Sequence, residues 1–239
     1  FIEKSLRSKQ TNELQMDFMT LCVERGLITP IEVEDFVVEA QGFQNSLSYW
    51  TLVNATMSIG TINFFQALLP KAINGISEKR NGIAQYQIQQ LIFIRKMIIS
   101  DSAFFHNINC RALIEAIKDI FVSHPNHSVA LTEIADFAIK SVTNDLFTRA
   151  IIDLFIPAAR KAVKERRTVT QAVVSLDFLV RMKHLSNSCE LTADIPPDGE
   201  IDIVVDRLVR EEEFNSICDV SLLSSQFMND YEEIVPLTV

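Results

Sequence analysis

The chain has 239 residues, of which 48% are hydrophobic, and it carries a formal net charge of −9. This apolar content excludes a disordered chain, and the negative charge argues against nucleic-acid binding, which needs clustered Lys and Arg. Only six glycines occur, far fewer than the tight turns of an all-β protein of this size would need, so an all-α fold is favoured.

The first two predicted helices form an antiparallel pair. Residues 12–25 show apolar side chains at helical spacing, and Gly26 ends this helix. Its predicted inward face consists of Leu14, Phe18, Leu21 and Cys22. Thr29-Pro30-Ile31-Glu32 then predicts a capping box with Pro at the first helical position, and the second helix is expected to end near Gln41.

Three further helices are expected in the next sixty residues. Residues 46–57 and 61–69 are predicted as short helices that are separated by Gly60, and Pro70 is expected to stop the second one. Residues 83–99 are predicted as a longer helix.

The second half of the chain contains stronger signals for the starts of helices. Asn109 is expected to cap a helix that ends before His124-Pro125, and Ser128 is expected to cap the next one, which stops near Val142. A helix that starts at Thr143 or Asn144 is predicted to break or kink at Pro157. Thr168-Val169-Thr170-Gln171 predicts a second capping box.

The C-terminal part differs in charge from the rest. Residues 190–239 contain 13 acidic and 2 basic residues and carry −11, whereas the first 189 residues carry +2. Residues 186–199, with two prolines and Asp198-Gly199, are the strongest candidate for a linker between the two parts. We therefore predict a helical body over 1–189 and an acidic helical cap and tail over 190–239. Against the body, the cap helix should bury an apolar side, which consists of Ile201, Val204, Val205, Leu208 and Val209.

An internal repeat favours a particular all-α architecture. Residues 116–121 recur as residues 150–155 at an offset of 34, and Ala135-Asp136-Phe137 resembles Leu176-Asp177-Phe178 at an offset of 41. These lengths suit a two-helix α-solenoid, with an irregular helical bundle as the alternative. The repeat predicts that the matched rings Phe121, Phe137, Phe155 and Phe178 are buried.

The sequence contains no pattern that predicts a catalytic residue, a cofactor or a metal site. His124 and His127 lie in a turn without a nearby Cys, so a zinc site is not expected. His184 and Cys189 are close in sequence, but a Cys nucleophile also needs an oriented base and an oxyanion site, which the sequence does not show. No phosphate-binding loop or hydrolase motif occurs, and we expect a protein that is not an enzyme.

A basic segment is the one candidate binding site. It consists of Arg160, Lys161, Lys164, Arg166 and Arg167. Cations at the end of a helix can simply complement its dipole and keep the surface soluble. Alternatively, the segment binds an acidic or phosphorylated segment of another protein, or the acidic C-terminal part of this chain.

The cellular setting is inferred from what the sequence lacks. The apolar run Leu91-Ile92-Phe93-Ile94 is followed at once by Arg95 and Lys96, so no membrane span is expected. The four cysteines are scattered, which is typical of a reducing compartment, and we expect a cytoplasmic protein. The chain begins with Phe1, not Met, which indicates a fragment.

The helix pairs, especially 113–139 and 147–179, resemble armadillo/HEAT repeats, which as a class are scaffolds and adaptors. The order from Ala112 through residues 119–121 and 124–128 to Phe214 is also similar to SAPS-type regulatory subunits of protein phosphatases, although their aromatic and Asn-Asn turn signature is missing. The resemblance implies a protein-binding scaffold or regulatory adaptor. Alternatives are a regulator that binds a small GTPase in trafficking or cytoskeletal control, and a helical enzyme of unknown reaction.

Overall fold

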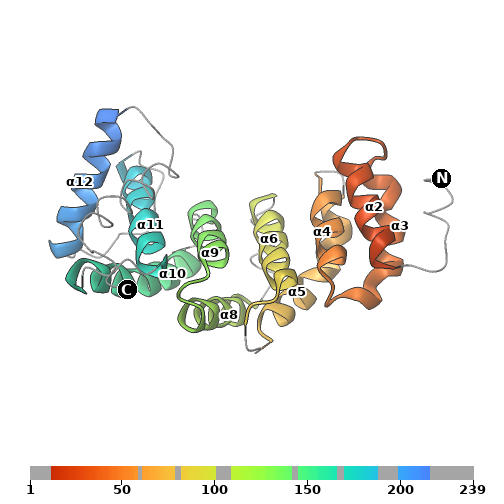
Figure 1. The fold of residues 1–239 in the computed structure, drawn as a ribbon, viewed down its shortest axis with the longest axis horizontal. Coiled ribbons are helices and arrows are strands. Elements are labelled where there is room, and N and C mark those ends of the chain that lie inside the picture. Colours follow the sequence, from red (N-terminus) through yellow and green to blue (C-terminus); the bar gives the residue numbers. More distant parts are fainter. Residues whose placement is uncertain are drawn as a thin grey trace, which may run out of the picture. The chain divides into compact units, whose positions relative to one another are not determined.

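The computed structural model describes residues 12–58, 61–78, 82–100, 109–141, 145–165, 170–187 and 199–215, and over these residues it is helical and without strands (Figure 1). This confirms the all-α prediction for the part of the chain that is described. The α-helices are α2 (Glu13–Glu24), α3 (Pro30–Glu39), α4 (Leu47–Thr56), α5 (Leu69–Ile76), α6 (Gln85–Ser100), α8 (Cys110–Ser123), α9 (Ser128–Lys140), α10 (Asp145–Glu165), α11 (Thr170–Asn187) and α12 (Gly199–Asn215). Two 3₁₀-helices, η1 (Ala40–Phe43) and η2 (Ile62–Leu68), complete the set.

The chain divides into two compact units, Phe1–Ile120 and Phe121–Val239. The boundary falls inside α8, a position that no linker signal in the sequence indicates. The predicted division at residue 190 stays a prediction, because residues 188–198 lie outside the described ranges.

In the first unit, the orientation of α2 differs from the predicted one. The helix begins with a capping box, in which Gln15 N donates to Asn12 Oδ1 at 3.0 Å and Asn12 N donates to Gln15 Oε1 at 3.1 Å. Its buried residues are Met16, Met19, Thr20 and Cys22, whereas Leu14 is 81% and Leu21 is 48% exposed. The helix carries two apolar stripes, and the methionine stripe, not the leucine stripe, is buried in the unit.

The start of α3 confirms its predicted capping box. Glu32 Oε2 accepts from Thr29 N and from Thr29 Oγ1, both at 2.7 Å. These bonds, the backbone bond first, stabilise the carboxylate and lower the pKa of Glu32. Gly26, at φ 66°, turns the chain between α2 and α3, where a side chain would be strained.

The prediction that Pro70 ends a helix is wrong. Residues 62–68 form the 3₁₀-helix η2, and Pro70 lies in the first turn of α5 instead of ending a helix. Proline lacks an N–H, but the first turn has no intrahelical partner for one, so Pro70 fits there. Gly60 lies outside the described residues.

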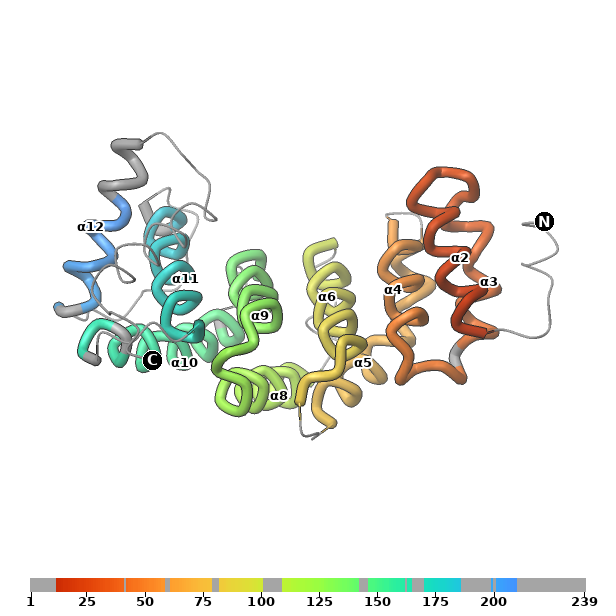
Figure 2. The backbone as a smooth tube through the Cα atoms, viewed as in Figure 1, coloured from red at the N-terminus to blue at the C-terminus, as the bar shows by residue number. Residues whose placement is uncertain are grey.

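The core of the first unit lies between successive helices. Helix α4 packs on α2, α3 and α6, and α5 packs on α6, as the backbone trace of Figure 2 shows. Trp50 is fully buried, and its ring contacts the tilted ring of Phe93 of α6, with the ring centroids 5.4 Å apart. Its indole Nε1 donates to Gln44 O at 2.6 Å, so burial of the ring leaves no unpaired N–H.

Of the helix caps predicted for α8 and α9, the first is confirmed and the second is wrong. Asn109 caps α8, since its Oδ1 accepts from Ala112 N at 3.1 Å. The cap of α9 is His127, not Ser128: His127 Nδ1 accepts from Ala130 N at 3.3 Å. Helix N-caps are usually predicted from Ser, Thr, Asp or Asn, whose side-chain oxygen accepts the hydrogen bond. Here an imidazole nitrogen accepts it instead.

Helix α10 runs through Pro157, which the sequence predicted to break or kink it. The missing N–H would have bonded to the carbonyl of Asp153, four residues earlier. Both residues are exposed, so water can satisfy that carbonyl while the helix continues. The predicted start at Thr143 or Asn144 lies outside the described residues, as do Val142 and Thr168.

The second unit buries the four predicted rings. Phe121, Phe137, Phe155 and Phe178 are at most 3% exposed. Phe155 lies 4.8 Å from Phe121 and 4.6 Å from Phe178, measured between ring centroids. Helix α11 packs on α9 and α10, and α12 packs on α11 and α10, as predicted for a cap. Ile201, Val205 and Val209 of its predicted apolar side are buried, whereas Val204 and Leu208 are half-buried. Among the described helices, none is long and apolar enough to cross a membrane.

Candidate functional site

The predicted basic segment lies at the C-terminal end of α10. The helix packs inward through buried residues that include Phe147, Ile151, Phe155 and Ala159. Arg160, Lys161 and Lys164 are exposed on the other side of the helix, in line with exposed Arg149. The helical period therefore turns these cations away from the core and towards solvent.

Three of the five predicted residues can be placed. Arg160 and Lys164 take part in further interactions within the structure, so they are not free groups. Lys164 lies in the last turn, where its charge complements the negative end of the helix dipole. Arg166 and Arg167 lie outside the described residues. Chemically, such a surface can hold carboxylate or phosphate oxygens through guanidinium and ammonium N–H groups.

The acidic helix α12 belongs to the same unit. Its Asp206 Oδ1 lies 3.6 Å from Lys183 Nζ of α11, and both side chains are more than one third exposed. This pair is outside the basic segment, and its contribution to stability is small because solvent screens it. Burial of the apolar side of α12 is therefore the stronger attachment.

An ion-pair cluster on α9 and α11 was not predicted from the sequence. Arg181 Nη2 lies 2.7 Å from Asp136 Oδ1, and Arg181 Nη1 lies 3.6 Å from Asp177 Oδ2 (α11). Asp136 and Asp177 are equivalent positions in the internal repeat, which is the signal that could have indicated a shared partner. Arg181 thus joins two matched positions on neighbouring helices.

The histidine turn has a structural use. His127 caps α9, and the same turn receives α11: Gln171 N donates to Pro125 O at 2.9 Å. Gln171 Nε2 also donates to Phe121 O at 2.7 Å, which satisfies one of the last carbonyls of α8. No group of three or more His, Cys, Asp or Glu able to hold a metal occurs in the described part of the chain.

Two of the four cysteines lie in the described residues. Cys22 is buried and Cys110 is half-buried, and neither is in a disulfide. Burial raises the pKa of Cys110, which keeps it protonated, whereas a nucleophile needs a lowered pKa. Cys189, which was considered with His184, lies outside the described residues, as does Cys218.

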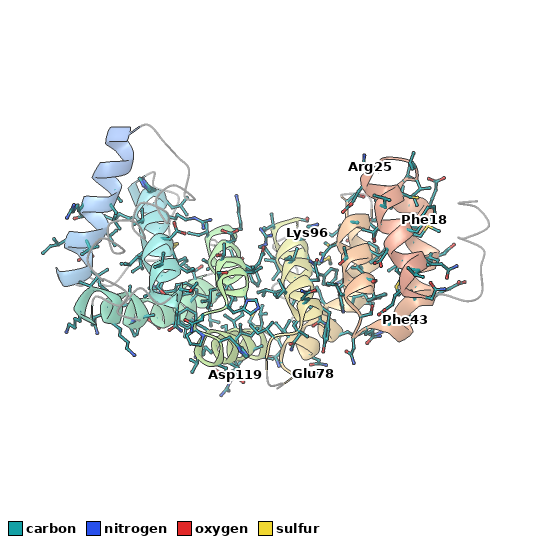
Figure 3. The ribbon with its side chains drawn as sticks, viewed as in Figure 1. Phe18, Arg25, Phe43, Glu78, Lys96 and Asp119 are labelled. Atoms are coloured by element: carbon teal, nitrogen blue, oxygen red, sulfur yellow. The ribbon has the colours of Figure 1, made fainter. Side chains whose placement is uncertain are left out.

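Buried polar side chains in the first unit connect helix ends. Gln87 Nε2 of α6 donates to Gly75 O at 3.0 Å and to Glu78 O at 3.1 Å. Lys96 Nζ donates to Asn54 O near the end of α4 at 2.8 Å, and Figure 3 labels Lys96 and Glu78. The bond from Lys96 satisfies one of the last carbonyls of α4, which the end of a helix leaves without an intrahelical partner. The cluster therefore has a structural role in holding α4, α5 and α6 together.

Comparison with known proteins adds no assignment: no protein-family model, curated protein or solved structure matches the chain.

Proposed function

We propose that this chain is a protein–protein interaction scaffold or regulatory adaptor, built from stacked helix pairs of the armadillo/HEAT kind. The observation that supports it is contact between equivalent repeat residues. Phe121 and Phe155, which the repeat aligns, lie 4.8 Å apart between ring centroids. The aligned carboxylates Asp136 and Asp177 share Arg181.

Such contacts are characteristic of a repeat stack. In a solenoid, each repeat packs only on its neighbours, so equivalent side chains of successive repeats meet. The packing of α9 on α11 and of α10 on α12 follows this alternating order, and so does that of α2 on α4 and α4 on α6. An irregular bundle does not require it. Stacked helix pairs leave long faces for partner proteins, and no catalytic group is part of the proposal.

The proposed binding surface in the second unit is the basic segment, and its ligand is an acidic or phosphorylated segment of another cytoplasmic protein. Exposed Arg160 and Lys161 lie on one side of α10, away from the buried rings. Carboxylate or phosphate oxygens would form charge-assisted hydrogen bonds with them.

The test is capture of partners from native lysate by the full chain, with identification by mass spectrometry. We expect a set of proteins that the wild type retains and that Arg160→Glu/Lys161→Glu loses. The matched control is Lys140→Glu, a reversal at an exposed cation of α9. Retention should fall as salt rises, because solvent-exposed charges are screened. Equal retention by the double variant would contradict a binding role for the segment.

A further inference from the structure

The outer sides of α2 and α3 carry exposed apolar residues at regular spacing. On α2, Leu14 is 81% and Leu21 is 48% exposed, and on α3, Ile31 is 65% and Val38 is 45% exposed. Leu27, in the turn between the helices, is 65% exposed. Single exposed apolar residues are common on protein surfaces. Here the two exposed apolar residues of each helix are seven positions apart, so they lie on the same side of that helix.

These side chains are not part of the core of the first unit. Both helices bury another side, which contains Met16 and Met19 on α2 and Val33 and Phe36 on α3. The leucine stripe of α2 is therefore additional to the one that holds the helix in place. Covering a leucine that is now exposed would be favourable, because its apolar surface would be removed from water.

Carboxylates accompany the exposed apolar residues on both helices. Asp17 follows Leu14 by three positions, Glu24 follows Leu21 by three, and Glu34 follows Ile31 by three. Over residues 13–39 there are seven acidic residues and one basic residue, Arg25, which Figure 3 labels with Phe18 on the same segment. The side chains of Asp17 and Glu24 have no ion pair or hydrogen bond within the described residues. The negative charge of this surface is thus not neutralised from within the described part of the chain.

We infer that this acidic apolar surface, defined by Leu14, Asp17, Leu21 and Glu24 of α2, binds a basic amphipathic helix of a partner protein. The apolar side of that helix would cover the leucines, and its flanking Lys or Arg would pair with the carboxylates. An anionic lipid surface or nucleic acid would be repelled by the same charges. The inference rests on the proposed scaffold function and adds a second partner class, opposite in charge to the ligand of the basic segment.

The test is a titration of the full chain into a fluorescently labelled 18-residue probe peptide with Leu on one helical side and Lys elsewhere, followed by anisotropy. A second probe has every Lys replaced by Glu, and a third has the first composition scrambled. We expect saturable binding of the first probe alone, weaker at high salt. Leu14→Ser/Leu21→Ser should weaken it about tenfold or more, since burial of two leucines is lost.

Two controls locate the binding. Val122→Ser/Val129→Ser removes two equally exposed apolar residues in the second unit, 68% and 55% exposed, and should leave the affinity unchanged. Asp17→Asn/Glu24→Gln should weaken binding and reduce its salt dependence, and as exposed polar changes these two substitutions should not disturb folding. Arg160→Glu/Lys161→Glu should bind the probe as the wild type does, which separates this surface from the basic segment.

Three outcomes would overturn the inference. One is equal binding of the Lys and Glu probes. Another is an equal loss of affinity in the two serine variants. The third is a concentration-dependent dimer in sedimentation that Leu14→Ser/Leu21→Ser abolishes, because the surface would then bind a second copy of the chain.

Discussion

At the residue scale, Phe155 contacts two other buried rings of the second unit: it is fully buried, and its ring centroid lies 4.8 Å from that of Phe121 and 4.6 Å from that of Phe178. Truncating it removes contacts with both neighbours and leaves a cavity in a close-packed interior. We expect Phe155→Ala to lower the free energy of unfolding by about 3–5 kcal/mol, measured by urea denaturation of the full chain. Phe64→Ala is the matched control, since that ring is 38% exposed and should cost markedly less. A loss below about 1 kcal/mol for Phe155→Ala would place its ring outside the core.

At the element scale, substitutions in α12 can show whether this acidic helix is a packed cap. Val205 is 5% exposed on the side of α12 that contains Ile201 and Val209, whereas Ile203 on the same helix is 71% exposed. Val205→Asp would bury an unpaired charge, so it should lower the melting temperature by at least about 5 °C and increase the binding of a hydrophobic dye. Ile203→Asp introduces the same group into solvent and should change neither quantity. If both variants behaved like the wild type, α12 would be a detached tail.

At the scale of the whole molecule, the helices of the two units predict the spectrum of the intact chain. The described α-helices have repeated caps, such as Asn12, Asn109 and His127. We expect a far-ultraviolet circular dichroism spectrum with more than half helix and a negligible strand contribution. The scaffold proposal depends on this, because stacked helix pairs leave no part of the body for a sheet. A substantial strand signal from the purified full chain would contradict the architecture.

The sequence by itself determined those features that depend on neighbouring residues along the chain. The caps at Thr29 and Asn109 were predicted correctly, because a cap needs only a side-chain acceptor and the next three residues. The four buried rings were also predicted, because the internal repeat matches them in pairs, and so was the inward side of α12, whose apolar residues recur at helical spacing. The basic residues of the candidate site could be listed from the sequence, but their exposure on α10 had to come from the structure.

Tertiary structure decided the features for which the local sequence allows two arrangements or carries no information. Helix α2 has two apolar stripes, and only its packing on α4 determines that Met16 is buried and Leu14 is exposed. Pro157 can stay inside α10 because the carbonyl that it leaves unpaired belongs to an exposed residue. Gln171 and Arg181 bind partners 50 and 45 positions earlier in the chain, and local patterns carry no information about such contacts. Their free energy depends on which helices meet, and only the folded chain brings those helices together.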